Sequence, residues 1–216
     1  MQELEDNRLF ILKRLGILRI LSIIEAFIVA FLAFVFTKDL IICIVLAVFV
    51  GILFFRLTSK TLLQKKSMLE LEITRLFLRQ NHAKFKSLGI KEKDFATLSS
   101  LNFNDFKSLN SFEFKHFTVY DVFFKDEVKR AFCGIFIKSQ KDVNKELNQD
   151  LEQIFTKINV KKFDTNHLCC GDKWILISTL RNPFFADLKL SVEKNLKIMQ
   201  ENLDKIKALF SPHSLQ

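Results

Sequence analysis

The four residues His167-Leu168-Cys169-Cys170 include three side chains that could bind a metal ion. Structural zinc sites use Cys and His ligands, but they take four of them, commonly as two pairs separated by a loop. The second pair is missing here, unless Cys133 or His116 joins the cluster in space. We therefore expect ordinary turn residues rather than a metal site, and no cofactor.

Other side chains that could act as nucleophile, base or acid are scattered along the chain. A thiol could pair with an imidazole, but nothing local singles out one pair, and buried thiols are usually inert. The carboxylates sit at strand and turn positions, where they favour solubility over acid-base work. The thiol is that of Cys133, the imidazoles are those of His82 and His116, and the carboxylates are those of Asp121, Asp126 and Glu127. Because the chain also lacks a glycine-rich phosphate loop, G-x-S-x-G and H-E-x-x-H, catalytic residues stay unknown and a non-enzyme is favoured.

The elements that position these groups begin with an apolar block over 20–55, broken by Thr37-Lys38-Asp39. The uncharged run 40–55 has sixteen residues, and 20–36 has seventeen with one acid. A hydrocarbon core of about 30 Å needs roughly 20 helical residues, so each run is slightly short but sufficient with its flanks. The start is too acidic and the block too long for a signal peptide. The pattern predicts a hairpin of two membrane-spanning helices.

Glu25 is the single acid within these spans, and an intramembrane carboxylate is a candidate for ion or proton transport. It lies only about 8 Å past Ile20 at 1.5 Å per residue. A carboxylate that reaches the interface, or that pairs with Arg56, is the simpler interpretation.

Basic residues lie before and after the hairpin but are almost absent from its turn. Four precede it, and the turn has only Lys38; the four that follow are Arg56, Lys60, Lys65 and Lys66. The positive-inside rule then puts both termini in the cytoplasm of an inner-membrane protein with two spans. Residues 57–93 hold nine basic and three acidic side chains, so the anionic inner leaflet is the expected partner of these four residues. No nucleic-acid-binding motif accompanies this charge, and we expect no nucleic acid partner.

The rest of the chain predicts an α+β domain. A long amphipathic helix should follow the second span from 57 to about 88 and end at Gly89, and 91–109 should hold a short helix and loops. The pattern of 112–138 predicts a β-hairpin, with Gly134 at a bulge or a close backbone contact. We expect a helix over 142–157. A short strand over 160–163 and a strand over 174–178 should complete a small, mostly antiparallel sheet.

The C-terminal segment has the strongest helical periodicity outside the membrane. Ser191 is a plausible N-cap, and a heptad seam follows at Val192, Leu196, Met199, Leu203, Ile206 and Phe210. Packing onto its own domain is favoured, and a dimer seam is the alternative. The predicted organisation is a cytoplasmic segment 1–19, a hairpin 20–56, a basic juxtamembrane helix 57–93 and a cytoplasmic domain 94–216.

Short motifs resemble an uncharacterised bacterial membrane protein family, domain of unknown function 3137. They are the paired spans, Tyr120-Asp121-Val122, and Phe132-Cys133-Gly134-Ile135-Phe136, which is similar to the family's Phe-x-Gly-x-Phe core. The resemblance implies an α+β cytoplasmic domain on a two-span anchor and supplies no catalytic residues. It also implies a LemA-like membrane protein as one potential partner.

These observations favour a membrane-tethered interaction or scaffold module in a bacterial inner membrane. A membrane-associated hydrolase or metal-dependent enzyme using 116–178 is one alternative. A subunit of an oligomeric channel or transporter using Glu25 is another, and a homo-oligomer is compatible with each.

Overall fold

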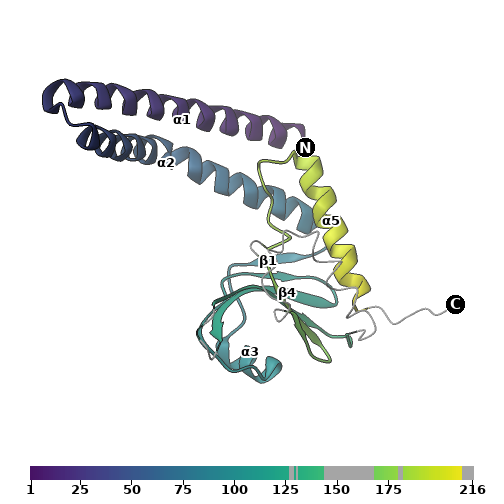
Figure 1. Cartoon of the computed structure of the whole chain (residues 1–216). Coiled ribbons are helices and arrows are strands. Elements are labelled where there is room, and N and C mark those ends of the chain that lie inside the picture. The colour runs from purple at the N-terminus through teal and green to yellow at the C-terminus, as the bar shows by residue number, and fades with distance from the viewer. Residues whose placement is uncertain (127–128, 130, 144–167, 180–181, 211–216) are drawn as a thin grey trace. The chain divides into compact units, whose positions relative to one another are not determined.

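The computed structural model describes residues 1–126, 129, 131–143, 168–179 and 182–210. It confirms an α+β fold: two long apolar helices, then an antiparallel sheet and a C-terminal helix (Figure 1). The chain divides into two compact units, one formed by 1–73 with 186–194 and the other by 74–185 with 195–216. Each unit is built around its own set of contacts.

Helices α1 (Gln2–Thr37) and α2 (Leu40–Gln80) form the antiparallel hairpin of the first unit. Both are long and apolar enough to cross a membrane. Their apolar side chains face outward, and Phe36 is 84% exposed, so this surface needs a non-aqueous covering. Helix α1 already begins at Gln2, so the predicted N-terminal segment belongs to the same helix as the first predicted span.

A tight turn joins the two helices at the predicted polar triplet. Lys38 adopts a left-handed conformation (φ 52°) and donates its N–H to Phe34 O at 3.0 Å, which ends α1. Asp39 then caps α2, because its Oδ1 accepts the N–H groups of Ile41 at 2.8 Å and Ile42 at 3.3 Å. The triplet therefore ends one helix and starts the next.

Small side chains allow the two helices to approach closely. They recur every fourth residue, as Ser22, Ala26 and Ala30 on α1 and Cys43, Ala47 and Gly51 on α2. A Cβ added at Gly51 would lie 3.1 Å from Ala26 Cβ. Membrane helices commonly associate through such small residues, since no aqueous hydrophobic effect drives them together.

The start of α1 is hydrogen-bonded to a distant segment of the same unit. Arg8 is buried, forms an ion pair with Glu5, and donates from Nη1 to Leu188 O at 3.0 Å. Glu5 Oε2 in turn accepts the N–H of Val192 at 2.9 Å. We call these four residues the N-terminal clasp.

Helix α2 ends at Gln80, so the prediction of a helix continuing to about Leu88 is wrong. His82 takes φ 51°, its N–H donates to Arg79 O, and the N–H of Ala83 donates to Leu78 O at 2.8 Å. This pair of bonds is a Schellman motif, which satisfies the last carbonyls of a helix and turns the chain away. Strand β1 (Lys84–Lys86) follows immediately, where helix was expected.

The second unit is built on a sheet whose described strands number seven, six of them in the order β1-β3-β4-β5-β7-β6 and β2 also paired to β4. The remaining strands are β2 (Phe103–Lys107), β3 (Ser111–Glu113), β4 (Phe117–Asp126), β5 (Ala131–Ser139), β6 (Leu168–Cys170) and β7 (Trp174–Ser178). The β4–β5 pair confirms the predicted hairpin, and β7 confirms the predicted strand. Strand β2 replaces a predicted loop.

Gly134 lies in β5 at a close backbone contact, as its position predicted. A Cβ there would lie 2.1 Å from Ile177 O of β7, so no larger residue fits without moving the strand.

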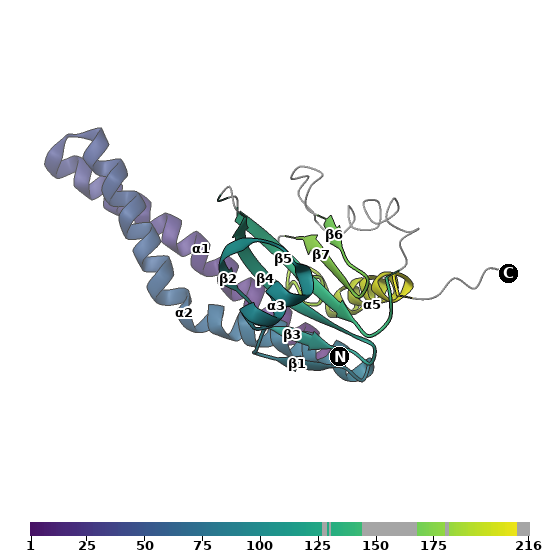
Figure 2. The ribbon, with the colours of Figure 1, turned by 90° about the horizontal axis from the view of Figure 1, so that it is seen from below.

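Apolar side chains cover both faces of the sheet. On one face, helix α3 (Glu92–Ser99) lies against the strands, as Figure 2 shows. Its Phe95 is fully buried there. That core consists of Ile90, Phe95, Val122, Phe124, Phe132, Phe136 and Leu176. On the other face, Phe112 and Phe114 pack on Phe184 with ring centroids 5.9 and 5.0 Å apart, and Phe117 stacks on Phe210. A sheet covered on both faces explains why so many phenylalanines are buried.

The C-terminal helix α5 (Val192–Ala208) confirms the predicted helix. Ser191 is its N-cap, because its Oγ accepts the N–H of Lys194 at 3.2 Å. Five seam residues are buried within the chain, and Leu196 is half-buried. The predicted helix over 142–157 and strand over 160–163 fall largely or wholly outside the described residues.

Candidate functional site

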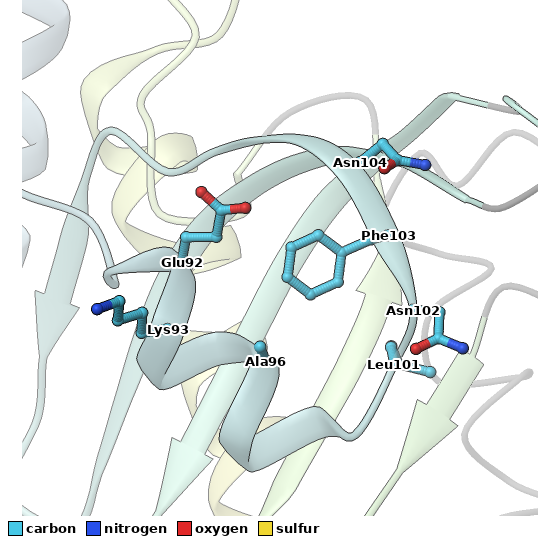
Figure 3. A pocket seen from close by; sticks show the side chains of 7 residues that line it. All are labelled: Glu92, Lys93, Ala96, Leu101, Asn102, Phe103 and Asn104. Atoms are coloured by element: carbon cyan, nitrogen blue, oxygen red, sulfur yellow. The ribbon is translucent and has the colours of Figure 1, made fainter.

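An open cleft lies between α3 and β2 (Figure 3). Its volume is about 680 Å³, and Figure 3 shows the Phe103 ring pointing from β2 toward the helix. The lining comprises Glu92, Lys93 and Ala96 of α3, the connecting residues Leu101 and Asn102, and Phe103 and Asn104 of β2. An aromatic face is thus surrounded by amide, carboxylate and ammonium groups.

Phe95 holds the two walls of this cleft together. It is fully buried, and its ring lies 5.1 Å from Phe103 and 4.8 Å from Phe106 between centroids. Glu92 and Asp94 occupy the first turn of α3, where negative charge complements the helix dipole. Ser100 (φ 54°) ends the helix and turns the chain into β2. The cleft is therefore a fixed feature of the Phe-rich core beneath it.

Strand β2 forms one edge of the sheet. It pairs with β4 on one side, and no described strand pairs with its other side. A register shift lies between Asn104 and Lys107, and Asp105 has φ 53°. Lys125 Nζ lies 2.6 Å from Asp105 Oδ2, and this hydrogen bond lowers the pKa of the Asp105 carboxyl. A bulge with charged groups discourages indiscriminate strand pairing but leaves backbone groups available for a specific partner.

The cleft has the chemistry of a binding surface. Recognition by strand addition uses an unpaired sheet edge for main-chain hydrogen bonds and neighbouring pockets for alternate side chains. The outer edge of β2 offers an unpaired sheet edge, and the space around Phe103 and Ala96 offers a pocket for side chains. An extended polypeptide segment matches both features.

A second polar cluster lies on the opposite face of the sheet around Asp121. Its carboxylate accepts the Nδ2 groups of Asn110 at 2.9 Å and of Asn182 at 2.5 Å. Asn182 Oδ1 accepts the N–H of Phe184 at 2.9 Å, so the cluster positions the Phe184 ring. Burial raises the pKa of Asp121, while the two amide hydrogen bonds lower it. Asp121 therefore ties chain segments together, a role that its strand position did not indicate.

Cys133 of β5 lies on the same face of the sheet as Asp121 and is the cross-strand partner of Phe123. The Cys133 side chain is exposed, but desolvation by the surrounding sheet and then the charge of Asp121 raise the pKa of its thiol. A thiol with a raised pKa is a poor nucleophile, because the thiolate is the reactive form.

The structure separates the histidines predicted as candidates from this thiol. His116 immediately precedes Phe117, which pairs with Ser139, whereas Cys133 is six residues back along β5. At about 3.3 Å per residue, the two lie roughly 20 Å apart. His82 occupies the Schellman turn after α2. These residues do not form a Cys-His pair.

Within the described residues, no three His, Cys, Asp or Glu side chains are arranged to hold a metal ion. Cys169 and Cys170 lie in β6, opposite Leu176 and Ile175, and His167 is outside the described residues. Residues 168–170 thus form a strand where turn residues were expected, and the prediction that this cluster is not a metal site stays untested.

The predicted membrane-surface residues lie on α2 beyond its apolar part. Arg56, Lys60 and Lys65 are exposed, and Lys66 lies 3.8 Å from Glu70. Glu25 is half-buried on α1, and in the described part of the chain it forms no ion pair with Arg56.

Comparison of the chain with family models, with curated proteins and with solved structures finds no match. The resemblance to domain of unknown function 3137 stays a prediction.

Proposed function

We propose that this chain is a bacterial inner-membrane protein whose cytoplasmic α+β domain is a membrane-tethered interaction module. The observation that carries the proposal is the cleft between α3 and the outer edge of β2. In this function, the cleft binds an extended segment of a partner protein.

The dimensions of the hairpin support membrane insertion. Lys38 lies nineteen positions after Arg19, and Arg56 lies seventeen positions after Asp39. At 1.5 Å per residue these stretches are about 29 and 26 Å long, close to a hydrocarbon core of about 30 Å. The outward apolar side chains between those charges then face lipid.

The charge distribution supports an orientation with both termini in the cytoplasm. Arg19 and Arg56 mark one end of the spans, and Lys38 is the single basic residue at the other. In this orientation the exposed residues Arg56, Lys60 and Lys65 lie near the anionic inner leaflet. In a variant whose four cysteines are replaced, Lys38→Cys should react with a membrane-impermeant maleimide from the periplasmic side only.

The partner is a protein in this proposal, and a LemA-like membrane protein or a second copy of the chain is a candidate. Both could present an extended segment at the membrane. A binding surface with an aromatic base and polar rim is typical of specific protein recognition.

Photo-crosslinking in intact cells tests the interaction module. A photoreactive residue at Asn104, which lines the cleft, should give an adduct of one defined mass. The additional substitution Ala96→Arg places a long cation in the cleft and should abolish that adduct. Thr97→Arg is the matched control, because Thr97 is exposed on the same helix but does not line the cleft.

An adduct that survives Ala96→Arg, or that disappears equally with Thr97→Arg, would contradict binding in the cleft. Circular dichroism of each variant confirms that the domain is folded.

A further inference from the structure

A groove runs along the hairpin between α1 and α2, separate from the cleft of the domain. Its volume is about 1070 Å³, and its lining is almost entirely apolar. The small residues Ser22, Ala26 and Ala30 of α1 and Cys43, Ala47 and Gly51 of α2 contribute to its lining. Larger side chains on both helices, such as Phe27 and Val48, border the same space.

Two arginines line the end of this groove that is far from the turn. Arg19 of α1 and Arg56 of α2 are both exposed. Within the described residues, neither guanidinium group has a hydrogen-bond or ion-pair partner, in contrast to Arg8 in the N-terminal clasp. Glu25, the single acid in the spans, does not line the groove. The groove therefore combines an apolar length with a doubly cationic end.

We propose that this groove binds one anionic phospholipid of the inner leaflet. Arg19 and Arg56 hold its phosphate, and one acyl chain lies in the groove on the floor that the closely packed small residues form. The inference rests on the proposed membrane insertion of α1 and α2. Basic pockets between membrane helices on the cytoplasmic side are a recognised setting for anionic headgroups.

The dimensions agree with one leaflet of the bilayer. Half of a hydrocarbon core of about 30 Å corresponds to roughly ten helical residues. Counted from Arg19, that distance ends close to Ala30, so the row Ser22, Ala26 and Ala30 spans the depth of one acyl chain. The aqueous end of the groove then coincides with the headgroup layer.

Charge favours a lipid over a second hairpin as the occupant. A second copy in the same orientation would bring its own two arginines to the same depth as Arg19 and Arg56. Like charges brought together across an interface cost several kcal/mol. A phosphate placed there instead receives charge-assisted hydrogen bonds from guanidinium groups, whose planar geometry suits phosphate.

Native mass spectrometry of the full chain in detergent tests the site, with phosphatidylglycerol and phosphatidylcholine as probes. The wild-type chain should retain one phosphatidylglycerol in preference to phosphatidylcholine. Each arginine near a phosphate is expected to contribute about fivefold, so Arg19→Gln with Arg56→Gln should weaken phosphatidylglycerol binding roughly thirtyfold. Lys13→Gln with Lys65→Gln is the matched control, since both lysines are exposed and neither lines the groove.

A second variant, Ala47→Phe, fills the groove without changing charge and should also lower lipid retention. Equal retention of the two lipids by the wild-type chain, or an unchanged preference in the double arginine variant, would overturn the site. A dimer that excludes lipid would overturn it as well. Alkaline extraction of membranes separates the two proposals: a chain that is extracted overturns the spans and the site, whereas a retained chain without lipid preference overturns the site alone.

Discussion

Replacing Glu5 by Gln should open the N-terminal clasp while leaving the sheet intact. Glu5 pairs with Arg8, whose side chain is only 10% exposed, and accepts the N–H of Val192 at 2.9 Å. A glutamine can still accept from Val192, so the main loss is the ion pair. Leaving a buried charge without its partner costs about 3–5 kcal/mol, and the 29% exposure of Glu5 reduces this through solvent screening. We expect a loss of about 2 kcal/mol, or roughly a thirtyfold change in the opening equilibrium.

Hydrogen exchange followed by mass spectrometry measures this opening. Backbone amides around Val192 should exchange roughly thirtyfold faster in Glu5→Gln. Amides of β4 should keep their wild-type rates, because β4 belongs to the other unit. Glu3→Gln is the control, since Glu3 is exposed in the same helical turn. Unchanged exchange at 190–193, or equal acceleration throughout the chain, would refute a local role for the clasp.

The same clasp gives a pH dependence with a defined sign. The hydrogen bond from Arg8, followed by that from Val192, lowers the pKa of Glu5 below its ordinary value. A carboxyl with a lowered pKa stabilises the folded state fully above the unfolded pKa of about 4.3, and this contribution is lost as the pH falls through the folded value. Opening at Val192, measured as the exchange rate relative to the intrinsic rate at the same pH, should therefore increase below about pH 4 in the wild-type chain. In Glu5→Gln it should show no such step.

Four further substitutions at three positions test the second unit, each by chemical denaturation of the purified chain with the β4–β5 amides as reporters. Asp121→Leu removes the acceptor for two asparagine amides and should lower the free energy of unfolding by about 1–3 kcal/mol. Because burial raises the pKa of the Asp121 carboxyl, the wild-type domain should gain stability as the pH falls through that pKa. Asp121→Asn should not show this gain. Phe95→Ala should cost about 3–5 kcal/mol, since the ring is fully buried, and a loss below about 1 kcal/mol would contradict its central place in the core. Gly134→Ala should prevent normal β5–β7 pairing, because its Cβ would lie 2.1 Å from Ile177 O, and a variant of wild-type stability would show that the strands can separate without cost.

Local patterns predicted those parts of the fold that depend on neighbouring residues. The polar triplet at 37–39 marked the helix turn, and Ser191 with its following heptad marked α5, because capping and periodicity act within a few residues. The Schellman turn at Asn81 and His82 was missed, since the left-handed position is filled by His rather than Gly. Gly89 instead lies in the chain between β1 and α3, beside Ser108.

The candidate sites could not be predicted in the same way. Asp121 looked like a solvated strand residue, but its partners Asn110 and Asn182 come from 11 and 61 residues away along the chain. The cleft depends on β2, a short strand whose sequence Phe-Asn-Asp-Phe-Lys has little β propensity apart from its phenylalanines. Pairing with β4 supplies the stability that this segment lacks alone. A binding surface formed by long-range pairing has no local signature.

The N-terminal clasp also sets an order of events during synthesis. Arg8 bonds to a carbonyl 180 residues further along the chain. At about 5–20 residues per second, the ribosome needs roughly 9 to 36 s to produce that acceptor after Arg8 itself. Both apolar helices are complete long before then, so the hairpin can form before the clasp closes. Burial of Arg8 against Leu188 O therefore marks the point at which residues 1–188 have all been made.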